Sequence, residues 1–213
     1  MSNSRENILS KVRNALSKKV EMHEKPDFAS EIYFKPKDKS SLEFFIENFH
    51  KTKGDLHVCT NEKDFLEKIS AFVKVKSYTS TFAWEEKVIH LLSKSDVKFS
   101  TTEQDFISAD LGITFCESLI ARTGSIILSS ASTAGRRLNI FPHSNLVIAY
   151  TSQIVDDIKD GLIKVKAAHR TLPSMVSLTT GPSRTADIEK TLVLGAHGPK
   201  DLILFLINDS SNK

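Results

Sequence analysis

The sequence has few of the residues that mark specialised protein classes. Its two cysteines, Cys59 and Cys116, lie far apart and form no CxxC pair. We therefore expect no disulfide framework, structural zinc site or cysteine-ligated iron–sulfur cluster, and a reducing cytoplasmic compartment is the natural one. No apolar run approaches the ~20 residues of a membrane span, and the polar N-terminus lacks the hydrophobic region of a signal peptide.

The sequence also has little net charge and none of the familiar catalytic motifs. The 29 Lys and Arg against 26 Asp and Glu give a net charge of only +3, whereas nucleic-acid binding needs a concentrated basic stripe. The sequence contains no HxxxH, GxSxG, GxxxxGK or GxGxxG pattern. We therefore expect no metal site, no hydrolase triad, no P-loop and no resident dinucleotide cofactor.

The composition is that of an ordinary globular protein, with 213 residues of which 40% are hydrophobic and 26% charged. Apolar residues at helical spacing predict an amphipathic helix over residues 5–19, and the stretch 20–40 contains two prolines and no periodicity. We therefore expect an N-terminal helix and extended arm over residues 1–40. One α/β domain is expected over residues 41–213.

From residue 41 onward, segments with helical periodicity alternate with short apolar runs. Such alternation predicts a mostly parallel sheet with right-handed crossovers. Two β-rich runs, residues 111–121 and 125–130, are joined by a link too short for a crossover helix, so we expect an inserted β-hairpin there. The other expected helices are 41–53, 61–74, 82–93, 152–168 and 186–194, and the other expected strands are 55–60, 75–79, 96–100, 146–150, 175–180 and 202–207.

The C-terminal half contains most of the glycines, which permit unusual backbone conformations, and most of the arginines, whose planar guanidinium groups bind anions. Seven of the eight glycines and five of the seven arginines lie between Gly112 and Gly198. Within this half, Gly124 separates the two β-rich runs, where it either forms a plain hairpin corner or admits a ligand.

Two further turns contain candidate site residues. The segment 181–189 follows a strand and opens a short helix, and its polar residues either cap that helix or, with Arg184 and free amides, bind an anion. In the segment 195–199, His197 has little packing around its backbone, so it is either a surface histidine or an acid/base, anchor or ligand group. We expect the three glycine-bearing turns to meet at one rim of the sheet around a positively charged hollow.

The residues of 120–126 (IARTGSI), 181–189 (GPSRTADIE) and 192–199 (LVLGAHGP) resemble the motifs of the LUD-domain family, of the lactate utilization protein C (LutC/YkgG) type. The resemblance implies a Rossmann-like three-layer α/β/α fold related to NagB, RpiA and CoA transferases. It also implies a role in oxidising L-lactate to pyruvate beside iron–sulfur partner proteins. The family usually has Glu where this chain has Arg122, which reverses the charge, whereas Glu117 matches an acidic position of the motif.

Three functions follow from these observations. The first is a non-redox accessory component of L-lactate oxidation. The second is a small-molecule enzyme acting on a phosphorylated, CoA-linked or folate-type anion, and the third is a regulatory or scaffold protein; a homo-oligomer is compatible with each. The candidate catalytic residues are Glu117 and His197, and the candidate ligand-binding residues are Arg122, Thr123, Gly124, Ser125, Gly181, Ser183, Arg184, Thr185 and Gly198.

Overall fold

The computed structural model describes residues 4–17, 38–185 and 193–209. The chain divides into two compact units, Met1–Phe34 and Lys35–Lys213, and each is described by itself.

The first unit contains helix α1, Ser4–Ser17. All of its side chains are exposed, including the apolar Ile8 and Leu16, at 63% and 78%. The helix predicted over residues 5–19 is therefore confirmed as far as residue 17. Most of the predicted arm lies outside the described residues.

Five parallel strands form the central sheet of the second unit, in the order β1-β11-β6-β3-β2. Every residue of β11 except Asp201 is buried. A parallel strand covered on both faces needs apolar side chains on both, which explains its continuous apolar run in the sequence. The expected α/β fold with a mostly parallel sheet is confirmed. The strands are β1 Asp55–Cys59, β2 Thr81–Ala83, β3 Leu111–Phe115, β6 Ser144–Tyr150 and β11 Asp201–Ile207.

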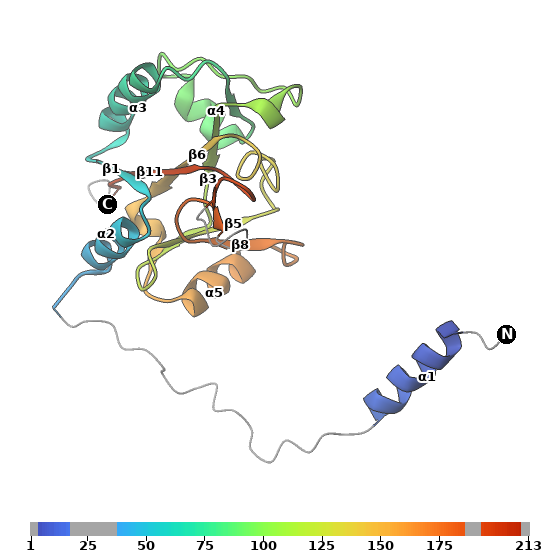
Figure 1. Cartoon of the computed structure of the whole chain (residues 1–213). Coiled ribbons are helices and arrows are strands. Elements are labelled where there is room, and N and C mark those ends of the chain that lie inside the picture. The colour runs from blue at the N-terminus through green and yellow to red at the C-terminus, as the bar shows by residue number, and fades with distance from the viewer. Residues whose placement is uncertain (1–3, 18–37, 186–192, 210–213) are drawn as a thin grey trace. The chain divides into compact units, whose positions relative to one another are not determined.

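Helices α3 and α4 cover one face of this sheet, and α2 and a second sheet cover the other (Figure 1). On one face, Ile203 and Phe205 pack with helices α3 and α4. On the other, Leu204 and Leu206 pack with α2 and a second sheet. Alternate residues of β11 thus belong to different cores, because successive side chains of a strand point to opposite faces. The helices are α2 Ser41–Lys51, α3 Glu62–Lys76, α4 Glu86–Leu92 and α5 Ile158–Ala168.

The second sheet has the strand order β7-β4-β5-β8 and carries α5 on its outer side (Figure 1). Strands β4 and β5 form the expected antiparallel hairpin, but its first arm is shorter than predicted, because residues 111–115 of the run predicted over 111–121 form β3 of the central sheet. Leu119 and Ile126 face the core shared with the central sheet, whereas Ile120 and Ile127 pack with Val165 of α5. The hairpin is therefore part of a separate layer rather than of the central sheet. The strands are β4 Ser118–Ile120, β5 Ser125–Ser129, β7 Ile154–Val155 and β8 Val176–Thr179.

The structure differs from the sequence prediction between residues 75 and 100. Helix α3 continues to Lys76, where its last turns pack against the core through Phe72 and Val73, so the strand predicted over residues 75–79 is wrong. Strand β2 follows instead, and α4 begins at Glu86 rather than at residue 82. The strand predicted over residues 96–100 is reduced to a single bridge at Ser100.

The helix predicted over residues 152–168 begins only at Ile158. The preceding residues form a 3-10 turn, Thr151–Gln153, and strand β7. Strand β7 pairs with β4, whose outer backbone groups would otherwise be buried without partners. Asp157 then caps α5 by accepting a hydrogen bond from the Ile158 amide at 2.5 Å.

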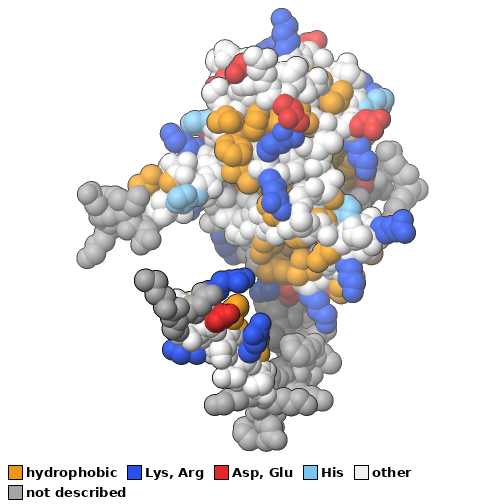
Figure 2. Space-filling model, turned by 90° about the vertical axis from the view of Figure 1, so that its right-hand side faces the viewer, with side chains coloured by type: hydrophobic (Ala, Val, Ile, Leu, Met, Phe, Trp, Pro, Cys, Tyr) orange, Lys and Arg blue, Asp and Glu red, His pale blue; other side chains and the backbone are white. Residues whose placement is uncertain are grey.

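Lys and Arg side chains are spread singly over the face of the molecule in Figure 2, between groups of apolar side chains. Across the ranges that the structure describes, no helix combines the length and apolarity needed to cross a membrane.

Candidate functional site

The three glycine-bearing turns lie next to one another. The hydroxyl of Ser125 is 2.6 Å from the hydroxyl of Thr180, which joins the first turn to the second. The Ser183 amide donates to the Pro199 carbonyl at 2.9 Å, and the Gly195 amide donates to the Ser183 carbonyl at 3.0 Å. A hydroxyl contact thus connects turns that are 55 residues apart in the sequence, and backbone contacts join the second turn to the third.

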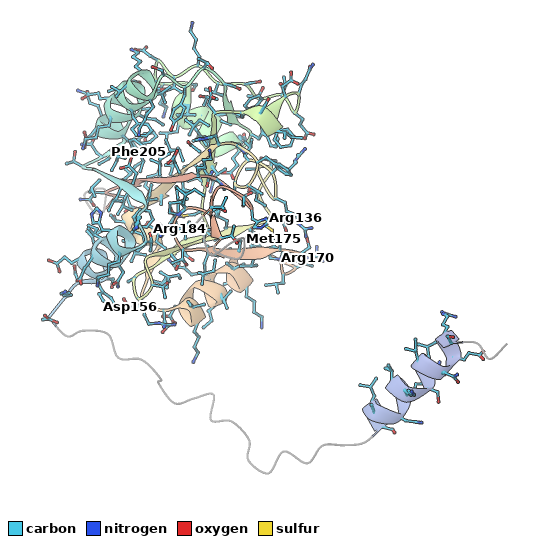
Figure 3. All side chains as sticks on the ribbon, in the orientation of Figure 1. Arg136, Asp156, Arg170, Met175, Arg184 and Phe205 are labelled. Atoms are coloured by element: carbon cyan, nitrogen blue, oxygen red, sulfur yellow. The ribbon has the colours of Figure 1, made fainter. Side chains whose placement is uncertain are left out.

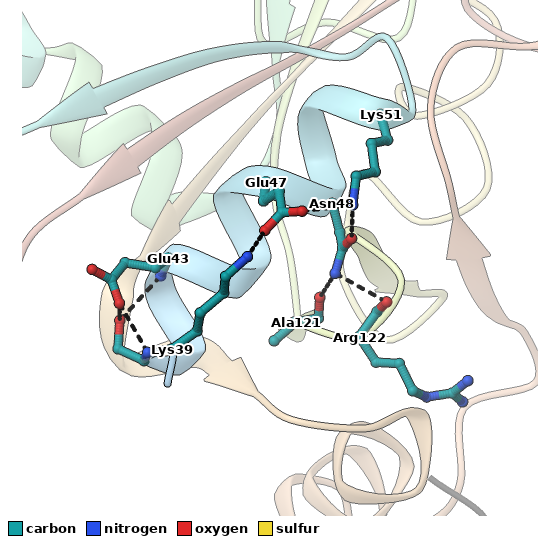
Figure 4. Close-up of polar contacts among 8 residues, drawn as sticks. Lys39, Glu43, Glu47, Asn48, Lys51, Ala121 and Arg122 are labelled. Carbon is teal, nitrogen blue, oxygen red and sulfur yellow. Dashed lines mark hydrogen bonds and ion pairs between the residues drawn. The ribbon is translucent and has the colours of Figure 1, made fainter. Parts of the chain in front are cut away.

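Helix α2 holds the first two turns in place. Asn48 donates to the carbonyl oxygens of Ala121 and Arg122 at 2.9 and 3.2 Å (Figure 4). Gly124 and Gly181 both have positive φ, of 61° and 82°, and a Cβ on either would overlap backbone atoms of the last turn of this helix or of Thr52, which caps it. Glycine is therefore required at both positions for conformation and for close approach.

The second and third turns line a cavity of about 350 Å³, here called the arginine cavity. Five of the candidate residues are in its lining: Gly181, Ser183, Arg184, His197 and Gly198. Strands β6, β8 and β11 supply its floor through Asn145, Ser177, Thr179 and Leu202.

Arg184 is exposed, and no acid among the described residues pairs with it. Its Nη2 donates to the carbonyl oxygen of Thr52 at 2.7 Å. This contact orients the guanidinium without neutralising it, so the remaining N–H groups can bind an anion. His197 is also exposed, so the cavity has two cation-forming side chains in its lining.

Asn145 places a buried acceptor in the same lining. Only 1% of the residue is exposed, and its Nδ2 donates to the Gly112 carbonyl and the Thr114 hydroxyl at 3.2 and 3.3 Å. Its Oδ1 has no hydrogen-bond partner within the described ranges. A buried acceptor left unpaired costs about 1–3 kcal/mol, which a ligand carrying a donor would recover.

The first residues of the segment 181–189 do not form the helix expected to begin there. Arg184–Thr185 form strand β9, which pairs with β10, Val193–Leu194. The helix predicted over residues 186–194 is therefore wrong at its last two residues, and residues 186–192 lie outside the described part. The Ser183 amide is already bonded, so an anion in this cavity would be bound by side chains rather than by a helix N-terminus.

The other candidate residues of the first turn and of β9 do not line this cavity. Arg122 lies 2.9 Å from the Asp157 carboxylate, and this guanidinium holds the pKa of Asp157 below its usual value. The Thr123 hydroxyl accepts a hydrogen bond from Ser125 at 2.7 Å, and Thr185 lies in β9. These side chains therefore support the turns around the cavity.

The remaining arginines of the C-terminal half are engaged elsewhere. Arg137 pairs with Glu103 at 2.6 Å and stacks on Trp84. Arg136 donates to the Ser174 hydroxyl. Figure 3 shows Arg136 and Arg170 well separated from Arg184. The arginine clustering in the sequence thus reflects several local roles, of which Arg184 provides the cavity's guanidinium.

Glu117 lies in a second cavity, of about 390 Å³, which we call the carboxyl-edge cavity because Glu85 and Glu117 follow the carboxyl ends of β2 and β3. Glu117 Oε1 accepts from the Ser129 hydroxyl at 2.5 Å and lies 2.9 Å from His169 Nε2. The two candidate catalytic residues, Glu117 and His197, are therefore in different cavities.

Sequence reasoning missed Glu85, Asn145 and His169. Glu85 is 8% exposed and accepts from the Phe115 amide at 2.7 Å. Because the strand before it was expected about six residues too early, Glu85 was assigned to the interior of a helix instead of to a strand end. Correct placement of β2 would have been the signal for it.

Among the described residues, no group of three or more His, Cys, Asp or Glu side chains has the geometry to hold a metal ion. Burial raises the pKa of the Cys116 thiol at the carboxyl-edge cavity, so this thiol is a poor nucleophile.

Comparison with known proteins gives consistent matches. A family model described as the LUD domain matches residues 42–207. Lactate utilization protein C of Bacillus subtilis is 36% identical over 104 residues, which are 47% of this chain and 43% of that protein. The uncharacterized protein NMB1437 of Neisseria meningitidis is 35% identical over 102 residues, 48% of this chain and 44% of that protein.

Two further matches extend over more of the chain. The uncharacterized protein YkgG of Escherichia coli is 28% identical over 162 residues, 75% of this chain and 66% of that protein. A solved structure of a DUF162 family protein from Deinococcus radiodurans is similar in fold, with a TM-score of 0.56, 20% identity, and coverage of 78% of this chain and 96% of that one. The matches to the Bacillus and Neisseria proteins span less than half the length of those relatives.

Proposed function

We propose a function from one premise: this chain belongs to the LUD domain family. The proposed function is that of a non-redox component of L-lactate utilization in the cytoplasm. In this role the chain binds a small 2-hydroxy acid, or the corresponding 2-keto acid, in the arginine cavity. It acts together with iron–sulfur partner proteins. Relatives named lactate utilization protein C support the pathway.

The observation that carries this proposal is the pairing of a guanidinium with a buried amide oxygen in one cavity. Arg184 suits a carboxylate, because its planar N–H groups match the two carboxylate oxygens. The Asn145 Oδ1 atom needs a donor, which the hydroxyl group of a 2-hydroxy acid supplies. The corresponding 2-keto acid lacks this hydroxyl group and satisfies the arginine alone, so we expect it to bind more weakly than the 2-hydroxy acid.

His197 and the Ser183 hydroxyl complete the proposed ligand shell. Both line the cavity beside Arg184, where the ring nitrogens of His197 and the Ser183 hydroxyl can form hydrogen bonds to a ligand. The place of His197 on an exposed turn gives a bound ligand contact with solvent or with a partner protein. Electron transfer is assigned to the partners.

Calorimetric titration of the full chain with L-lactate, pyruvate and inorganic phosphate tests the binding. We expect L-lactate to bind and the Arg184→Ala variant to bind it at least tenfold more weakly, since a hydrogen bond to a charged group contributes about 1.5–3 kcal/mol. Arg136→Ala is the matched control, because Arg136 contacts Ser174 outside the cavity. Equal lactate affinity in the wild type and Arg184→Ala would refute the proposed site.

The pathway role has its own test in the source organism. Disruption of the gene should abolish growth on L-lactate, and a tagged chain should retain iron-containing proteins from lactate-grown cells. Unimpaired growth on L-lactate would refute the pathway role. Turnover of L-lactate by the purified chain alone, with flavin or iron–sulfur absorbance, would refute the non-redox role.

A second candidate, an enzyme for a phosphorylated, CoA-linked or folate-type anion, is favoured by the cavity volume of about 350 Å³, which exceeds what lactate fills. The same titration separates the two, because a preference for phosphate over lactate supports the second candidate. A scaffold with no ligand would keep full activity in a reconstituted pathway after Arg184→Ala.

A further inference from the structure

The carboxyl-edge cavity is a second, open cavity, at the edge where open α/β sheets bind ligands. Glu85 and Glu117 each lie two residues beyond the end of a central strand, β2 and β3. Apart from Asn139, which lines both cavities, its lining is distinct from that of the arginine cavity.

Two buried acceptor atoms in this lining lack hydrogen-bond partners within the described ranges: Glu85 Oε1 and Asn139 Oδ1. Glu85 is more than nine-tenths buried, and its other oxygen, Oε2, is fixed by the Phe115 amide at 2.7 Å. The orphaned Oε1 therefore has a defined position. Buried acceptors of this kind indicate that a ligand with donor groups belongs in the cavity.

Glu117 is held in a fixed orientation in the same lining. The Ser129 hydroxyl and the His169 ring both contact Oε1, at 2.5 and 2.9 Å. No hydrogen bond to Oε2 is found among the described residues, so this oxygen can accept one from a ligand.

The charges around the cavity oppose an anion, because the carboxyl groups of Glu85, Glu86 and Glu117 line it. The ammonium group of Lys87 in the same lining disfavours a cation beside it. Burial raises the pKa of Glu85, the Phe115 amide and the nearby Ser132 hydroxyl oppose this effect, and the negative charge of Glu117 adds to it. A neutral Glu85 carboxyl also offers an O–H donor.

Hydroxyl groups make up much of the remaining polar lining, from Thr114, Ser129, Ser132 and Thr133. The Ser129 and Thr133 hydroxyls already donate, to Glu117 and to the Trp84 carbonyl, and keep lone pairs that can accept. The Thr114 hydroxyl accepts from Asn145 and keeps its donor, so the lining as a whole matches a ligand whose groups both donate and accept. We propose that the carboxyl-edge cavity is a second ligand site, which binds a small uncharged molecule carrying neighbouring hydroxyl groups.

Saturation-transfer NMR on the full chain tests this site, with erythritol and xylitol as probes and with acetate and propylamine as charged counterparts. We expect transfer to the two polyols and not to the charged compounds. Glu117→Gln should weaken polyol binding about tenfold or more, the loss expected for a charge-assisted hydrogen bond. Glu67→Gln on the exposed face of α3 is the matched control.

Three results would overturn the proposal. They are no transfer to either polyol, equal binding by Glu117→Gln and wild type, and displacement of erythritol by L-lactate, which would mean one shared site. If Glu117→Gln fails to fold, His169→Ala replaces it with the same expected loss. Failure of polyol binding leaves the Arg184→Ala titration with lactate unaffected, so the two proposals fail separately.

Discussion

Substitution of Gly124 by alanine probes the junction that holds the first two turns against α2. The residue has φ of +61°, and an added Cβ would lie 2.5 Å from the Asn48 carbonyl carbon and 2.7 Å from its oxygen. These are backbone atoms of a helix fixed on the core by Phe45 and Phe49, so they cannot move without disturbing that packing.

The expected loss has two parts. A left-handed backbone costs a non-glycine residue about 1–2 kcal/mol. Overpacking against fixed atoms costs about 1–3 kcal/mol. We therefore expect Gly124→Ala to lower the free energy of unfolding by about 3 kcal/mol, and the melting temperature by roughly 6–12 °C for a chain of this size.

Two other glycines separate these contributions. Gly135 has φ of +43°, but its added Cβ would meet only the Ser132 carbonyl oxygen, at 3.1 Å, so Gly135→Ala should lose about 1–2 kcal/mol. Gly198 lacks a positive φ, and its nearest neighbour would be the Ser183 Cβ at 3.4 Å. Gly198→Ala should therefore stay within about 0.5 kcal/mol of the wild type.

Denaturant unfolding followed by circular dichroism measures all three variants, with an unchanged m-value as the sign that only stability has changed. A Gly124→Ala variant no less stable than Gly135→Ala would refute the reasoning, because close approach to α2 would then contribute nothing.

Two further predictions concern the core and the response to pH. Phe205 is fully buried and its ring contacts Phe65 and Phe72, so Phe205→Ala should lose about 3–5 kcal/mol in the same assay; a loss below about 1 kcal/mol would contradict the packing described. The pKa of Glu85 is raised above its usual 4.5, so the folded chain holds this proton more tightly than the unfolded chain does. The bound proton of Glu85 therefore adds to the free energy of unfolding below pH 4.5. This contribution is lost as the pH rises through the pKa that Glu85 has in the folded chain. The melting temperature of Glu85→Gln should therefore fall less than that of the wild type when the buffer is changed from mildly acidic to mildly basic. An equal fall in the two proteins would contradict this prediction.

Much of the fold could be predicted from the sequence because its signals are local. Strand β11 is a continuous apolar run, α2 begins with a capping serine, Ser40, and the hairpin has a link too short for a helix. The parallel central sheet, the hairpin and the family resemblance all follow from such patterns, and the structure and the family match confirm them.

The misplaced elements are those decided by distant contacts. Residues 154–155 form a strand because the edge of β4 needs a partner, although their local sequence is compatible with a helix. Residues 75–76 stay helical because the last turns of α3 pack on the core. Neither contact leaves a periodic signal in the segment itself.

The sequence by itself determined that the chain has an α/β fold in which Gly124 and Gly181 form special turns. Only the tertiary structure decided that these two turns close on the end of α2, and that Glu117 faces a different cavity from His197. The physical reason is that local patterns fix the backbone of each turn, whereas a cavity is formed by side chains from strands and helices that are far apart in the chain.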